Sequence, residues 1–187
     1  MAEWASMRLF TGISIDPAVL TRIDSVVDRL RPLVRIRWSP PANFHITTKF
    51  IGEWPEDRLE VLKDALSAVG RTGRTSVRIA GLGYMPSARH SKILFAGIDG
   101  GEALPDLARR TDQALQPLGC ALETRPFRPH LTLARMKSEE YRELRSHTAN
   151  LKDIDFGSFE ASNFHLYLSQ PGASGSVYTE LATWSLS

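Results

Sequence analysis

Two segments that lie far apart in the chain share the pattern histidine, any residue, threonine. His45-Ile46-Thr47-Thr48 and His130-Leu131-Thr132-Leu133 each stand in a run of residues that predicts a β-strand. Because successive side chains of a strand point to opposite faces, each histidine shares a face with its threonine. A proline-containing, non-helical stretch precedes both copies, Ser39-Pro40-Pro41 before the first and Arg125-Pro126-Phe127-Arg128-Pro129 before the second. The repeated pattern therefore favours a fold that brings two equivalent strands together.

Hydrophobic periodicity predicts strands and amphipathic helices that alternate along the 187 residues. The predicted strands cover residues 7–15, 44–51, 76–82, 92–98, 130–135, 156–169 and 177–186, and the predicted helices cover 18–30, 55–69, 104–118 and 138–151. No linker rich in Gly, Pro or Ser separates independent domains. Each half has a motif strand, a helix and two further strands, so we expect an α+β fold of two related lobes. These lobes form one domain over residues 1–187, with residues 1–6 as a frayed extension.

Composition limits the class of protein. The formal net charge of +2 is too small for a strong nonspecific nucleic-acid binder, and we interpret the arginines Arg31, Arg35 and Arg37 as solvated surface. The single cysteine, Cys120, excludes an internal disulfide and suits a reducing compartment. The first residues resemble neither a signal peptide nor a membrane anchor. We therefore expect a cytoplasmic protein that is not associated with a membrane.

The two motifs carry the groups that proton transfer near neutral pH requires. The unperturbed pKa of histidine is about 6.5, so one imidazole can act as a base while the other acts as an acid. Threonine hydroxyls can donate hydrogen bonds to an anionic oxygen whose charge grows in the transition state. Two such donors around one centre suit a phosphate group.

Other kinds of site find less support in the sequence. There are no clustered cysteines, no histidines at helical i, i+4 spacing and no carboxylate beside either motif, which disfavours a metal site. Neither a serine nucleophile elbow nor a glycine-rich phosphate loop is present. His90, His147 and His165 lack a threonine two residues later. Among these three, His165 is the first candidate to contact substrate, because Tyr167 shares its strand face.

These residues resemble the 2H phosphoesterase superfamily, and within it the RNA 2′,3′-cyclic phosphodiesterases that were long named 2′-5′ RNA ligases. The segment from Arg125 to Arg135 carries the most specific likeness, and residues 37–52 resemble the family's first motif block. Residues 7–10 resemble its opening strand, and residues 166–169 with Tyr178 resemble its closing hairpin. The resemblance implies two pseudo-symmetric lobes of antiparallel sheet with helices on their outer faces. A central cleft would carry one His-x-Thr-x motif from each lobe.

The resemblance also implies a role for each site residue. His130 would be the proton acceptor that activates water, and His45 would be the proton donor to the departing 3′ oxygen. A 2′,3′-cyclic phosphate would thus open to a 2′-phosphate. Thr47, Thr132 and Arg135 would hold the phosphoryl oxygens. Neither a metal ion nor an organic cofactor would be required.

Three positions need separate interpretation. Thr48 stands where the family usually has an apolar residue, and we expect it to face away from the cleft. Arg135 follows His130 by five residues, so strict alternation places it on the opposite face unless the strand bends or ends first. Lys49 shares the parity of His45 and is a further candidate for the cleft face.

The expected substrates are RNA 3′ ends or small cyclic nucleotides, and we expect a monomer with no obligate protein partner. Two alternatives stay open at this point. The same site could act on a small cyclic nucleotide or on 2′-5′ linkages, by hydrolysis or ligation. Alternatively, the chain could be a noncatalytic module that binds RNA ends, which the intact pair of motifs disfavours.

Overall fold

A computed structural model describes residues 6–70, 73–85, 93–172 and 175–187. Of the predicted extension over residues 1–6, only Ser6 is described, and it begins the first strand. The helices and strands, in chain order, are β1 (Ser6–Ser14), α1 (Pro17–Leu30), β2 (Arg37–Trp38), β3 (His45–Pro55), α2 (Leu59–Ser67), β4 (Thr75–Met85), β5 (Ile93–Asp99), α3 (Ala103–Leu115), β6 (His130–Arg135), α4 (Tyr141–Thr148), β7 (Asp155–Ala161), β8 (Asn163–Gly172) and β9 (Gly175–Ser185).

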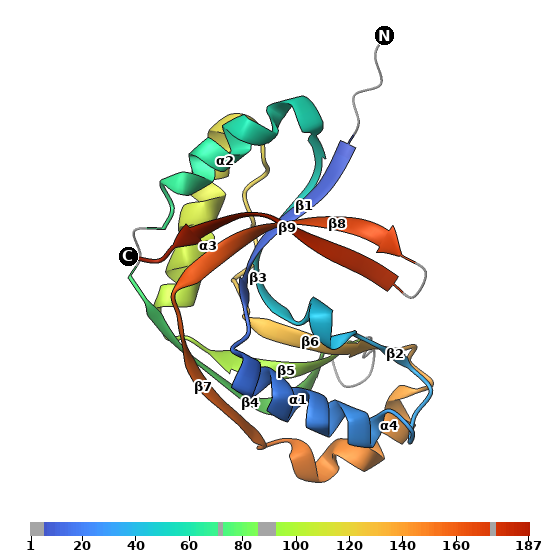
Figure 1. Cartoon of the computed structure of the whole chain (residues 1–187). Coiled ribbons are helices and arrows are strands. Elements are labelled where there is room, and N and C mark those ends of the chain that lie inside the picture. The colour runs from blue at the N-terminus through green and yellow to red at the C-terminus, as the bar shows by residue number, and fades with distance from the viewer. Residues whose placement is uncertain (1–5, 71–72, 86–92, 173–174) are drawn as a thin grey trace.

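The strands form two antiparallel sheets, and each sheet contains one motif strand. One sheet has the order β3-β1-β8-β9, and the other has the order β2-β6-β5-β4-β7. Helices α2 and α3 lie beside the first sheet and α1 and α4 beside the second, on the sides that face outward (Figure 1). The predicted α+β fold of two antiparallel lobes with outer helices is therefore confirmed.

Helix α1 illustrates how the sequence specifies these elements. The Asp16 carboxylate accepts hydrogen bonds from the backbone N–H of Ala18 (2.8 Å) and Val19, and Pro17 occupies the first helical position. This arrangement satisfies donors that otherwise lack a partner at a helix start. The buried positions follow a helical spacing and are Val19, Ile23, Val26, Val27 and Leu30. Each such side chain stabilises the fold by about 1.5–3 kcal/mol when fully buried.

The two lobes do not correspond to the two halves of the chain. Strands β4 and β5 follow the first motif strand, yet they pair with β6 and β7 in the second sheet. Strands β8 and β9 follow the second motif strand, yet β8 pairs with β1 in the first sheet. The prediction that each half contributes its own motif strand, helix and two strands to one lobe is therefore wrong in this detail.

The single strand predicted over residues 156–169 is two strands in different sheets. The chain leaves β7 at Ala161 and enters β8 at Asn163, with only Ser162 between them. The backbone needs no reversal to pass from one sheet to the other, so no glycine or proline marks the change. The two-residue strand β2 was also missed, because two residues are too few to show an alternation.

Candidate active site

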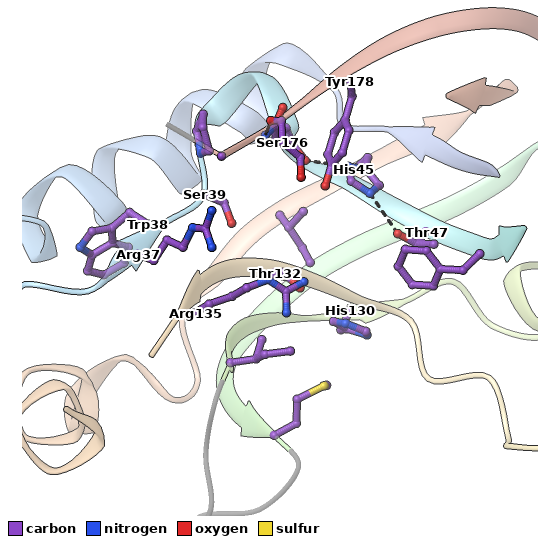
Figure 2. A pocket seen from close by; sticks show the side chains of 17 residues that line it. Arg37, Trp38, Ser39, His45, Thr47, His130, Thr132, Arg135, Ser176 and Tyr178 are labelled. Carbon is purple, nitrogen blue, oxygen red and sulfur yellow. Dashed lines mark hydrogen bonds between the residues drawn. The ribbon is translucent and has the colours of Figure 1, made fainter. Parts of the chain in front are cut away.

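Strands β3 and β6 face each other across one pocket with a volume of about 440 Å³. His45 and Thr47 line it from the first sheet, and His130 and Thr132 line it from the second. Arg135 lines the same pocket, so the structure brings together the five residues that the sequence singled out (Figure 2). The two imidazoles, two hydroxyls and one guanidinium of these five residues thus line a single space.

The same type of hydrogen bond to a backbone carbonyl orients both histidines. Nδ1 of His45 lies 2.6 Å from the carbonyl oxygen of Asn43, and Nδ1 of His130 lies 2.9 Å from that of Arg128. Because a carbonyl oxygen only accepts hydrogen bonds, Nδ1 carries the proton in each ring. In the neutral form of either ring, Nε2 therefore keeps its lone pair. Nε2 of His45 accepts a hydrogen bond from the Thr47 hydroxyl at 3.0 Å (Figure 2).

Aromatic side chains surround His45. The distances between its ring centroid and those of Phe10, Tyr178 and Tyr167 are 4.6, 5.1 and 6.0 Å. Burial lowers the pKa of His45 to about 4, the Asn43 carbonyl opposes this shift, and the charge of His130 adds to it. The His45 imidazole is therefore neutral at pH 7 when the site is empty. In the other lobe, Phe95 is the ring that packs against His130, at 5.9 Å.

A β-bulge follows the threonine of each motif. Thr48 has no partner in the β1–β3 register, because Gly12 faces Thr47 and Thr11 faces Lys49. Leu133 has none in the β5–β6 register, because Phe95 faces Thr132 and Leu94 faces Ala134. An extra residue in one strand reverses the alternation beyond it. The fourth residue of each motif is thus the extra, unpaired residue of a bulge.

The bulges decide which of the following side chains reach the pocket. Arg135, five residues after His130, returns to the cleft face and lines the pocket. Phe50, five residues after His45, does the same from the other lobe and is 72% exposed. Lys49 is turned away: its ammonium pairs with the Asp112 carboxylate and donates to the carbonyl oxygen of Ala121 at 2.9 Å. The expectation that Lys49 shares the cleft face is therefore wrong, because the bulge at Thr48 changes its parity.

Arg37, which we interpreted as solvated surface, also lines the pocket. Strand β2 pairs with β6 so that Arg37 lies opposite Arg135. Sequence reasoning missed this position, and it also missed Phe50 as a pocket residue. The available signal was the short distance along the chain between Arg37 and the first motif, but nothing in the sequence indicates that β2 pairs with β6.

His165 is part of a separate polar cluster. Its Nδ1 lies 2.9 Å from both a Glu180 carboxylate oxygen and the Thr183 hydroxyl, and its Nε2 accepts from the Ser14 hydroxyl at 3.2 Å. Burial lowers the pKa of His165, and the nearby Glu180 carboxylate opposes the shift. The residue is 8% exposed and does not line the pocket, so the expectation that it contacts substrate gains no support. His90, weighed with it, lies outside the described residues.

The described parts of the chain hold neither a metal-binding cluster nor a membrane-spanning helix. Over these ranges, no three His, Cys, Asp or Glu side chains gather into a group that could hold a metal ion. The helices within the same ranges are all too short or too polar to cross a membrane.

Comparisons with known proteins agree with this architecture. A sequence profile of the LigT-like phosphoesterases matches residues 13–95 and 98–178. The chain is 28% identical over 179 residues to an RNA 2′,3′-cyclic phosphodiesterase of Methanocaldococcus jannaschii, and the alignment covers 95% of this chain and 100% of that protein. It is 30% identical over 141 residues to an RNA 2′,3′-cyclic phosphodiesterase of Aeropyrum pernix, with 74% and 80% of the two chains covered. A crystal structure of a Thermus thermophilus protein superimposes with a TM-score of 0.83 at 27% identity, covering 96% of this chain and 98% of that one.

Proposed function

Because the chain belongs to the LigT-like phosphoesterase family, we propose that it hydrolyses 2′,3′-cyclic phosphates at RNA 3′ ends to 2′-phosphates, without a metal ion or organic cofactor. The observation that carries this proposal is the pair of histidines that face one pocket from two sheets, both with Nδ1 bound to a backbone carbonyl. The relatives named RNA 2′,3′-cyclic phosphodiesterase support the choice of substrate. Phosphoesterase activity itself follows from membership of the family.

In the proposed reaction, His130 is the general base. Its Nε2 takes a proton from a water molecule, whose oxygen attacks the phosphorus atom. The bond between phosphorus and the 3′ oxygen then breaks, and Nε2 of His45 gives its proton to that oxygen. One water molecule is consumed, and the product carries a 2′-phosphate and a free 3′ hydroxyl. A positioned acid or base of this kind contributes about 100- to 10,000-fold in rate.

The acid role requires a proton on Nε2 of His45, which the empty site disfavours, since burial lowers the pKa of this residue to about 4. The bound substrate supplies the compensation, because the negative charge of a cyclic phosphate favours the imidazolium form. The Thr47 hydroxyl, which donates to Nε2 in the empty site, is free to turn to a phosphoryl oxygen once the substrate binds. The proton on His45 is thus coupled to occupancy of the site.

The remaining pocket residues hold the substrate. The hydroxyls of Thr47 and Thr132 donate to the nonbridging phosphoryl oxygens, and the Arg135 guanidinium adds a charge-assisted contact. The exposed ring of Phe50 offers a face on which the terminal base stacks. The phosphate is therefore bound by residues of both lobes, and the base by a residue of the first sheet.

We extend the proposal to the organisation of the protein. Residues 1–187 act as one domain and as a monomer, because both motif strands of the pocket come from one chain and each sheet takes strands from both halves. Light scattering during size-exclusion chromatography tests the monomer. A dimer at assay concentrations would contradict it.

An oligoribonucleotide that ends in a 2′,3′-cyclic phosphate tests the reaction. With EDTA present, we expect conversion to the 2′-phosphate, read by chromatography against 2′- and 3′-phosphate standards. His45→Ala and His130→Ala should each lose about 100-fold or more, whereas His147→Ala, on the exposed face of α4, should retain the wild-type rate. Binding without turnover by the wild-type protein, or full activity in both motif variants, would contradict the proposal.

A further inference from the structure

A second hollow, with a volume of about 670 Å³, adjoins the candidate active site. Arg37, Gly175 and Ser176 line both hollows, so the two form one continuous groove with Arg37 at the junction. A hydrogen bond fixes the chain at this junction, because the side chain of Asn43, which lies in the turn before β3, donates to the carbonyl oxygen of Ser176 at 2.7 Å. A ligand longer than one nucleotide can therefore extend from the first hollow into the second.

Two arginine side chains lie next to each other in this groove. Arg37 and Arg135 face each other across the β2–β6 pair, so both project on the same side of the sheet (Figure 2). Within the described part of the chain, neither guanidinium forms an ion pair with a carboxylate. Like charges placed directly opposite each other on neighbouring strands are destabilising unless anions approach them. Two adjacent unpaired guanidinium groups therefore suit a ligand with two anionic groups, of which the cyclic phosphate is one.

The Arg37 side chain reaches the start of β9. Gly175 begins this strand and lines both hollows, and a Cβ atom there would lie 3.8 Å from Nη2 of Arg37, which is an ordinary van der Waals contact. The Arg37 guanidinium thus belongs to one sheet and reaches the hairpin of the other. It is placed between the two hollows and is exposed to the groove.

The second hollow has a different character from the first. Its polar lining includes two glutamates, one arginine besides Arg37 and two neutral polar side chains: Glu53, Glu56, Arg8, Ser169 and Gln170. The carboxylates accept hydrogen bonds from ribose hydroxyls and from base amino groups. Because two carboxylates stand beside this one further cation, the lining suits a nucleoside better than a further phosphate.

Resting on the proposed function, we propose that Arg37 binds the phosphodiester that joins the last two nucleotides of the RNA, and that the second hollow receives the penultimate nucleoside. The 5′ phosphate of a terminal nucleotide is separated from its 2′,3′-cyclic phosphate by the ribose alone, which matches two neighbouring arginines. The substrate class is then an oligonucleotide of at least two residues, and a mononucleoside 2′,3′-cyclic phosphate is a poorer substrate.

Three substrates test this inference: a mononucleoside 2′,3′-cyclic phosphate, the dinucleotide that carries the same end, and that dinucleotide with an uncharged methylphosphonate linkage. For the wild-type protein, we expect kcat/KM to be at least about tenfold higher for the dinucleotide than for the mononucleotide, as one charge-assisted contact allows. The methylphosphonate should lose most of this preference. In Arg37→Gln, the ratio of dinucleotide to mononucleotide should fall close to one.

Arg35→Gln is the matched control, because Arg35 is an exposed arginine two residues away that lines neither hollow. It should keep the wild-type ratio. Equal kcat/KM values for the mononucleotide and dinucleotide in the wild-type protein would overturn the inference while leaving the proposed function intact, and so would a ratio unchanged in Arg37→Gln. If none of the three substrates is hydrolysed, the proposed function itself fails.

Discussion

The two motif strands share a backbone and differ in their surroundings. In β3 and in β6, a histidine donates Nδ1–H to the carbonyl oxygen two residues earlier, and a bulge follows the threonine. Among the described residues, three aromatic rings enclose His45, whereas one packs against His130. The residue five positions after each histidine also differs, Phe50 in one strand and Arg135 in the other.

This difference bears on the two chemical roles proposed for His45 and His130. The hydrogen bond from Nδ1 to a backbone carbonyl orients both imidazoles in the same way, so it cannot distinguish an acid from a base. Burial and neighbouring charge can distinguish them, because both change the proton affinity of the ring. Substitutions in one motif strand at a time, compared with the matching substitution in the other, therefore test this contrast.

The largest expected difference between the two histidine variants appears when the leaving group of the substrate is changed. A p-nitrophenyl phosphodiester of a nucleoside releases p-nitrophenolate, which leaves without needing a proton. His45→Ala should therefore lose about 100- to 10,000-fold on a cyclic phosphate but far less on the nitrophenyl ester. His130→Ala should lose a similar factor on both substrates, because each needs an activated water. Steady-state kcat/KM values measured on the same protein preparations give the comparison.

The opposite result in this experiment would reverse the proposed acid and base roles of His45 and His130. If His130→Ala is the variant that the nitrophenyl ester rescues, then His130 is the acid and His45 is the base. Equal losses on both substrates in both variants would mean that neither histidine acts mainly on the leaving group.

The second prediction concerns stability at low pH. The pKa of His45 is lowered from 6.5 to about 4 in the folded protein, so the unfolded chain binds this proton first as the pH falls. His45 should therefore reduce the free energy of unfolding progressively from about pH 6.5 to about pH 4, by ~3 kcal/mol at most. Urea unfolding of the wild type and of His45→Gln over this range measures the effect. The difference between the two proteins at pH 7.5 gives the cost of the substitution that does not depend on pH. After this cost is subtracted, the free energy of unfolding should fall less in His45→Gln than in the wild type as the pH is lowered.

If the free energy of unfolding falls equally with pH in the two proteins, His45 is not desolvated in the folded state. The aromatic enclosure would then have no electrostatic consequence, and the contrast between the two motif strands would rest on Phe50 and Arg135 alone.

The sequence predicted the motif strands and their alternation, because a period of two is visible in the six to eight residues of each predicted strand. It could not predict where that alternation is broken. Lys49 and Arg135 show the consequence: simple parity placed Lys49 in the cleft and left Arg135 in doubt, whereas the bulges turn Lys49 away and return Arg135 to the pocket. Bulges depend on the register with a partner strand, and one chain segment does not contain that information. Arg37 was misinterpreted for the same reason, because its position depends on the pairing of β2 with β6.

Phe50 and Arg135, each five positions after the histidine of its motif, allow a further comparison of the two strands. Arg135→Gln should lower kcat/KM about tenfold or more for every base, because the lost contact is to the phosphate. Phe50→Ala should raise KM by about five- to tenfold, with a larger effect for purines than for pyrimidines, because the lost contact is a stacking surface. A panel of cyclic phosphates with the four bases separates the two results. An effect of Phe50→Ala that is the same for all four bases would argue against stacking.

The smallest expected effect concerns the bulge residues themselves, Thr48 and Leu133. Thr48 is buried, and its hydroxyl lies 2.8 Å from that of Thr11, which is also buried. Thr48→Val should lower the free energy of unfolding by about 1 kcal/mol, because the hydroxyl of Thr11 loses its partner. The double variant Thr11→Val/Thr48→Val should cost less than the sum of the single variants, since no hydroxyl then remains unpaired. Activity should stay at the wild-type level in all three proteins, because a bulge residue that packs as leucine does in β6 needs no hydroxyl to restore the cleft face. Loss of activity in a folded Thr48→Val variant would instead mean that the hydroxyl pair fixes the position of His45, and the two motif strands would then differ in their backbone support as well as in their surroundings.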